Sequence, residues 1–86
     1  MDLPIVVADT PGRRLRGLLG HRRPPPYALR LEGCRCVHTF GMRFALDLHW
    51  LDASGAVIRV DRGVGPGRVR ACLRARAIVE VPCDPP

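Results

Sequence analysis

The chain has 86 residues, enough for one domain (residues 1–86) with a modest core. Apolar residues make up 47% of it, which excludes a disordered chain, and no apolar run approaches the ~20 residues of a membrane span. The net charge of +6 comes from fourteen arginines, with no lysine. Because these arginines are spread along the chain and only four residues are aromatic, we expect no specific nucleic-acid partner.

The N-terminal sequence MDLPIVVADT has no basic segment and only a short apolar run, unlike a signal peptide. We therefore expect a cytoplasmic protein that does not associate with a membrane. In that compartment its four cysteines would be reduced thiols.

The first part of the chain contains two expected strands and one expected helix. PIVVA, at about residues 4–8, is rich in β-branched residues and favours a strand. A helix is expected at about residues 11–19, because Thr10 can act as its N-cap, Pro11 suits its first position and three leucines recur on one face. YALRLEG alternates between apolar and polar residues, which predicts a strand that Gly33 ends.

The remainder is expected to form strands separated by Gly and Pro turns. In FALDLHWLD, Asp47 and His49 share one face, and the other face holds Phe44, Leu46, Leu48 and Trp50. DASG is a turn into the second strand of a hairpin, AVIRVD; RGVGPGR is a loop, and ARAIVEVP is the last strand. With CRCVH also extended, the chain predicts a mainly β fold, a small β-sandwich or barrel-like domain with one short helix near the N-terminus.

Three segments, VADT…RGLLG, VHTFGMRFALDLHWLDASGAVIRV and ARAIVEVP, resemble the small bacterial and archaeal family called domain of unknown function 192. The most specific part is Met42-Arg43 followed by Leu46-Asp47 and the turn at residues 52–55. The resemblance covers most of the chain. It implies a compact, sandwich-like β-rich domain of unestablished biochemical activity, so it supports the fold and leaves the function open.

The chain departs from the family pattern in three places. Gly41 stands where the family has an aromatic residue, and Ala45 stands where it has a proline. The family continues past the last strand with a Gly-rich turn and a further strand, whereas here VPCDPP follows. We expect this difference to leave a sheet edge that the arginine-rich loop protects or a second copy pairs with, so a monomer or a weak homodimer is expected.

CRCVH places Cys34, Cys36 and His38 at alternate positions, which share one face if the segment is extended. Thiolate and imidazole suit zinc or copper, and Cys72 or Cys83 could supply a fourth ligand. The spacing also fits small buried thiols beside a hydrogen-bonded histidine, which we favour, so no cofactor is expected. Cys36 and His38 could also form a nucleophile pair, although nothing indicates a substrate pocket.

Asp47 and His49 lie on one strand face with their Cα atoms about 7 Å apart. A carboxylate there can orient an imidazole for general-base catalysis. Two solvent-facing polar groups, or an ion pair between Asp47 and an arginine, would give the same pattern, and we favour that interpretation. Ser54 is the only serine, which argues against a Ser-His-Asp hydrolase.

The leading hypothesis is a non-enzymatic binding or accessory module with a shallow polar cleft. Its ligand would be small and, given the arginines, anionic. The candidate ligand-binding residues are Arg16, His38, Thr39, Arg43, Asp47, His49 and Glu80. Two alternatives remain: a metal-binding protein that uses Cys34, Cys36 and His38, with or without catalysis, and a structural domain that dimerises through an exposed sheet edge.

Overall fold

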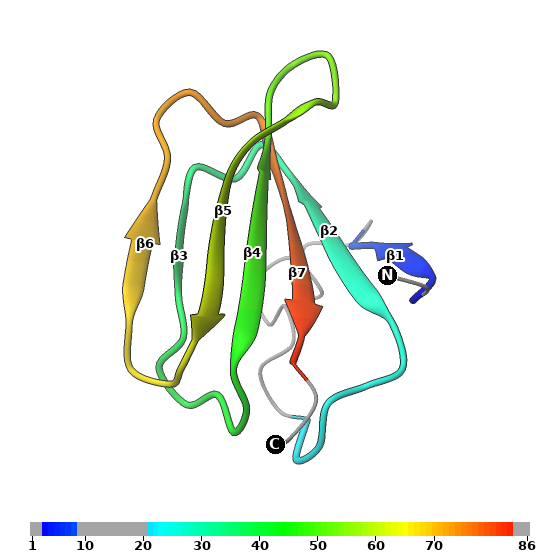
Figure 1. The fold of residues 1–86 in the computed structure, drawn as a ribbon, viewed down its shortest axis with the longest axis vertical. Coiled ribbons are helices and arrows are strands. Elements are labelled where there is room, and N and C mark those ends of the chain that lie inside the picture. The colour runs from blue at the N-terminus through cyan, green and yellow to red at the C-terminus, as the bar shows by residue number, and fades with distance from the viewer. Residues whose placement is uncertain (1–2, 9–20, 84–86) are drawn as a thin grey trace.

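The computed structural model describes residues 3–8 and 21–83, which form seven strands in two sheets (Figure 1). The fold is mainly β, as the sequence predicts. The helix expected at residues 11–19 lies outside the described residues. The strands are β1 (Ile5–Val7), β2 (Ala28–Glu32), β3 (Cys36–His38), β4 (Leu46–Leu51), β5 (Val57–Val64), β6 (Val69–Ala71) and β7 (Ala77–Pro82).

The larger sheet has five strands in the order β1-β2-β7-β4-β5. β1 runs parallel to β2, and the other neighbours are antiparallel. The last strand, β7, lies in the middle of this sheet and pairs with β2 on one side and β4 on the other. Any open edge is therefore not beside the last strand, because both sides of β7 carry ladder hydrogen bonds, and the edge strands of this sheet are β1 and β5.

One face of the five-stranded sheet, the inner face, packs against the smaller sheet. Alternation along β4 directs Leu46, Leu48 and Trp50 into this core, where each is at most 1% exposed. Leu29 and Leu31 of β2 join them. The predicted alternation of β4 is confirmed, and so is the predicted alternation of β2.

The smaller sheet consists of β3 and β6, paired antiparallel. Val37, in the middle of β3, is buried in the core, whereas its neighbours Cys36 and His38 are exposed. The sequence did not predict β6, because it is three residues long and directly follows a segment dominated by Gly, Pro and Arg. The two sheets together give the sandwich-like arrangement expected from the sequence (Figure 1).

The hairpin of β4 and β5 contains the turn that DASG predicts. Asp52 Oδ1 accepts hydrogen bonds from the amides of Ser54 and Ala56, at 2.9 and 3.0 Å, and from the Ser54 hydroxyl, at 2.6 Å. Gly55 has a φ of 86°, a conformation that glycine adopts without steric cost. The pairing is irregular between Leu46 and Leu48, where β5 bulges at Gly63.

The second face of the five-stranded sheet, the outer face, carries its own apolar cluster and is turned to the viewer in Figure 1. It consists of Ala28, Leu51, Ala77, Val79 and Val81, with Leu3 packed against them. All six residues of β7 are buried. In the part of the chain that the structure describes, no helix is long and apolar enough to cross a membrane.

Candidate functional site

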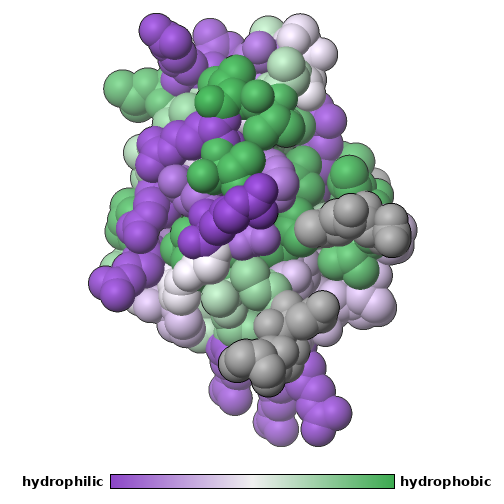
Figure 2. Space-filling model, viewed as in Figure 1, coloured by the Kyte–Doolittle hydropathy of each residue, from purple (hydrophilic) through white to green (hydrophobic). Residues whose placement is uncertain are grey.

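A groove of about 330 Å³ lies on the outer face. Its floor comes from β2, β7 and β4, and its walls come from the start of the chain and from the β4–β5 hairpin. The lining residues are Leu3, Ile5, Ala28, Arg30, His49, Leu51, Gly55, Val57, Val79 and Val81. Figure 2 views this face and shows hydrophobic surface interleaved with hydrophilic side chains. A concave apolar site with few polar groups is typical of small-molecule pockets, whose volumes are about 300–1,000 Å³.

Two side chains with polar ends, Arg30 and His49, line this apolar groove. Both are opposite Val79 in the sheet register, Arg30 on β2 and His49 on β4, so they flank Val79 on one row of the outer face. With neighbouring strands about 4.8 Å apart, their Cα atoms are roughly 10 Å apart. A small ligand lying over Val79 can therefore meet both side chains.

His49 presents an unsatisfied polar atom. Its Nε2 is buried and has no hydrogen-bond partner among the described residues. Leaving such a group unpaired costs about 1–3 kcal/mol. Buried polar atoms without a partner are rare in native proteins, and the carboxylate of a ligand would provide one.

Arg30 keeps most of its hydrogen-bonding capacity. Its Nε donates to Glu32 Oε1, a neighbour on the same strand face, and the arginine side chain is 33% exposed. Within the described residues its two Nη groups have no partner. A guanidinium with free Nη donors at the rim of an apolar groove suits a carboxylate.

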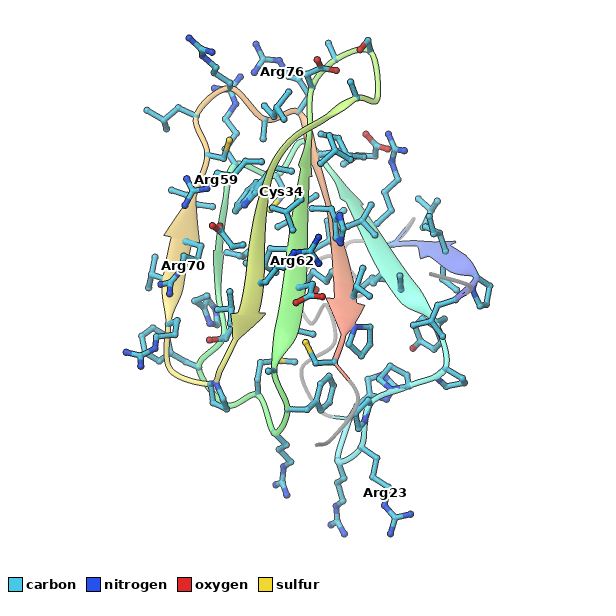
Figure 3. The ribbon with its side chains drawn as sticks, in the orientation of Figure 1. Arg23, Cys34, Arg59, Arg62, Arg70 and Arg76 are labelled. Carbon is cyan, nitrogen blue, oxygen red and sulfur yellow. The ribbon has the colours of Figure 1, made fainter. Side chains whose placement is uncertain are left out.

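Asp47 shares the outer face with His49, as predicted, but its contacts lead elsewhere. Its Oδ1 accepts a hydrogen bond of 2.8 Å from the amide of Gly63 and one of 3.4 Å from Cys83 Sγ. Its Oδ2 lies 3.8 Å from Arg62 Nη1, and Arg62 lies over β4 in Figure 3. Asp47 therefore stabilises the bulge of β5, and no hydrogen bond joins it to His49 within the described residues.

Glu80 and Thr39 are separated from this face. Glu80 is 5% exposed and lies opposite Leu29 and Leu48 in the register, so its side chain is on the inner face. Thr39 is 1% exposed; its hydroxyl donates to the Gly65 carbonyl at 2.7 Å and accepts from the Arg68 amide at 2.8 Å. These bonds tie the end of β3 to the loop before β6, a structural role.

The Cys34, Cys36 and His38 side chains do not gather around a common point. No group of three His, Cys, Asp or Glu residues within residues 3–8 and 21–83 could hold a metal ion. Gly33, with a φ of 68°, turns the chain before β3, and Cys34 packs against the core with its thiol donating to the Cys36 carbonyl at 3.3 Å. The alternation that would align the three ligands begins only at Cys36.

The two remaining candidates do not line the groove. Arg43 is exposed in the loop before β4, and His38 is exposed on β3 with its ring 5.5 Å from that of Phe40. Arg16 lies outside the described residues. Of the predicted ligand-binding residues that the structure describes, only His49 lines the groove.

The sequence did not identify Arg30 as a candidate, nor the apolar lining. One signal was available: in AIVEVP of β7, Ala77, Val79 and Val81 are apolar on the face opposite Ile78. Apolar residues on both faces of a strand indicate that both faces are covered or form a binding surface.

The family comparison accounts for nearly the whole chain. Residues 2–84 match the model of DUF192, a family described as "Uncharacterized ACR". The curated proteins and the solved structures gave no match. The β-rich fold, the hairpin around Asp52 and the position of Asp47 in β4 agree with the motif segments that suggested this family. The chain belongs to the DUF192 family, whose domains are uncharacterised.

Proposed function

We propose that the protein is a non-enzymatic binding module for a small apolar molecule that carries a carboxylate or a similar anionic group. The observation that carries the proposal is the buried, unpartnered Nε2 of His49 in a groove that is otherwise lined mainly by apolar side chains. The apolar part of the ligand would lie over Val79 and Val81. Its anionic group would bind between His49 and Arg30, with the His49 ring turned so that Nε2 faces the groove.

A binding role is favoured over catalysis because the groove brings no catalytic pair together. Asp47 is engaged by Gly63, Cys83 and Arg62, and does not orient His49. The apolar floor of the groove can bury the apolar part of a ligand, and this burial provides affinity. Four free cysteines support a cytoplasmic location, and the central position of β7 supports a monomer.

Isothermal titration calorimetry with a series of straight-chain carboxylates tests this proposal. Because each buried methylene contributes about 0.8 kcal/mol, each added carbon from butanoate to octanoate should strengthen binding about fourfold until the groove is full. Octanol should bind more weakly than octanoate, because its uncharged hydroxyl cannot form a bidentate ion pair with Arg30.

Four variants separate the groove from the rest of the surface. His49→Leu and Arg30→Met should each weaken octanoate binding about tenfold and leave octanol binding nearly unchanged. His38→Leu and Arg23→Met, exposed and outside the groove, are the matched controls and should have no effect. Equal losses in the controls, or no dependence on chain length, would contradict the proposal.

A further inference from the structure

The acidic residues in the described part of the chain are confined to one of the two sheets. Every described carboxylate belongs to the five-stranded sheet or its hairpin: Glu32, Asp47, Asp52, Asp61 and Glu80. Residues 33–46 and 62–76, which hold β3, β6, the loops around them, the first residue of β4 and the last three residues of β5, contain no acidic residue. They contain seven arginines: Arg35, Arg43, Arg62, Arg68, Arg70, Arg74 and Arg76.

Most of these arginines are uncompensated. Among the described residues only Arg62 of the seven forms an ion pair; Arg62 is on β5, and its partner Asp47 is on the neighbouring strand β4. Arg70 and Arg76 donate to neighbouring backbone carbonyls, which holds the guanidinium groups in place without neutralising them. Figure 3 places Arg70 beside β6 and Arg76 at the top of the molecule, whereas Arg23 projects from the bottom. The arginines next to β3 and β6, among them Arg35, Arg68 and Arg70, therefore carry positive charge that no ion pair among the described residues neutralises.

An exposed apolar strip runs along the outward side of this sheet. Register pairs His38 with Val69 and Cys36 with Ala71, and all four residues are exposed. Beyond the strand ends the strip continues to Phe40, 55% exposed, and to Leu73, 80% exposed. The strip is defined by Cys36, His38, Phe40, Val69, Ala71 and Leu73.

The rings of His38 and Phe40 form a platform at one end of the strip. Their centroids are 5.5 Å apart and the ring planes are inclined by 31°. Both residues are exposed, so one face of the pair can accept a further planar group. Exposed rings on a sheet surface bordered by arginines are the features that bind unpaired nucleotides, with bases stacked on the rings and phosphates held by guanidinium groups.

We propose that this surface binds single-stranded RNA or DNA without sequence preference. The outward side chains of β3 and β6 are apolar, a thiol and an imidazole, with none of the Arg, Asn or Gln residues that read base edges in a duplex groove. Stacking is independent of base identity, and contacts to phosphates carry no sequence information. The surface is separate from the groove around His49, so the two proposals stand or fall independently.

Fluorescence anisotropy with a labelled 12-residue oligouridine and its DNA counterpart tests this inference. At low salt we expect a Kd on the order of 10 µM. With three to four phosphates contacted, log K should fall against log salt with a slope of about −2 to −3. Arg68→Ala should reduce that slope by about 0.7, and Arg23→Ala, in the connection before β2 and outside the strip, should leave it unchanged.

Phe40 variants separate stacking from general attraction of charge. Phe40→Leu, which keeps an apolar side chain, should weaken binding about tenfold, whereas Phe40→Trp should retain or strengthen it. Because Phe40 and Arg68 are exposed, unchanged thermal unfolding verifies that these variants fold. Equal binding by the Leu and Trp variants, equal loss on Arg23→Ala, or no binding at low salt would overturn the proposal. Equal competition by polyglutamate, or tighter binding to vesicles of phosphatidylglycerol and phosphatidylcholine, would also overturn it.

Discussion

The indole Nε1 of Trp50 donates a 3.0 Å hydrogen bond to Oδ2 of Asp61. Trp50 is fully buried between the sheets, and Asp61 is on the neighbouring strand of the hairpin. The other carboxylate oxygen of Asp61 binds Arg59 at 3.0 Å, and Arg59 also donates to the Ala71 carbonyl of β6. This chain of contacts satisfies the indole and ties the five-stranded sheet to the smaller one.

Removing the carboxylate of Asp61 should therefore destabilise the protein. Asp61→Ala leaves the buried indole donor unpaired, which costs about 1–3 kcal/mol. Asp61→Asn keeps an acceptor and loses only a half-exposed ion pair with Arg59, which contributes about 0–1 kcal/mol. Urea unfolding measures both, and the double variant with Trp50→Phe should lose less stability than the sum of the two single losses. Equal stability of the Ala and Asn variants would contradict this account.

The bulge of β5 offers a second stability test. Gly63 has a φ of 61°, and a Cβ there would meet no atom within 4 Å. Gly63→Ala should therefore cost about 1–2 kcal/mol through its backbone conformation alone. Gly65→Ala is the matched control, because Gly65 has equal space and no positive φ, and it should be near neutral. Urea unfolding that gives equal losses for both would contradict a conformational origin.

Asp52 should make stability depend on acid pH. The hydrogen bond from the Ser54 hydroxyl, followed by that from the Ala56 amide, lowers the pKa of Asp52 from its ordinary value of 3.8. Because the folded pKa is the lower one, this group stabilises the fold fully above pH 3.8, and the contribution is lost as the pH falls through the folded pKa.

Carboxyl-detected NMR titration follows this group directly. Ser54→Ala should bring the pKa of Asp52 back toward its ordinary value, and Asp52→Asn should remove the corresponding part of the acid dependence of unfolding. An unchanged pKa in Ser54→Ala would show that the hydroxyl is not the dominant cause.

We predict that the Cys34, Cys36 and His38 cluster holds no stoichiometric zinc or copper. The physical reason is that Cys34 packs inward, whereas Cys36 and His38 point outward from β3. Elemental analysis of untagged protein purified under reducing conditions measures the metal content. Stoichiometric metal that Cys36→Ser abolishes would reverse this conclusion.

The alternation of β4 could be predicted because it is local. A strand that packs on a core has one apolar face. The apolar residues Leu46, Leu48 and Trp50 therefore predict the inner face, and Asp47 and His49 predict the outer face. The hairpin could be predicted because its turn is also local: Asp52 and Gly55 have intrinsic turn preferences. These properties depend on residues within one short segment.

The groove could not be predicted because it depends on register across three strands. Alternation within β7 places the side chains of Val79 and Glu80 on opposite faces of the strand. It does not tell which of the two shares a sheet face with His49. A one-residue slip would exchange the two, and only the pairing of β7 with β4 and β2 decides it. The same pairing brings Arg30 into the row of His49, from a strand nineteen positions earlier.

Mapping octanoate by methyl and imidazole NMR tests the central claim, binding in the groove, most directly. We predict saturable shifts for the methyl groups of Leu51, Val79 and Val81 and for the His49 ring, with the methyls of Val69 and Leu73 unchanged. The His49→Leu variant should require about tenfold more octanoate to reach the same methyl shifts. Saturable shifts confined to the smaller sheet, or no saturable shift at Val79 and Val81, would contradict the account.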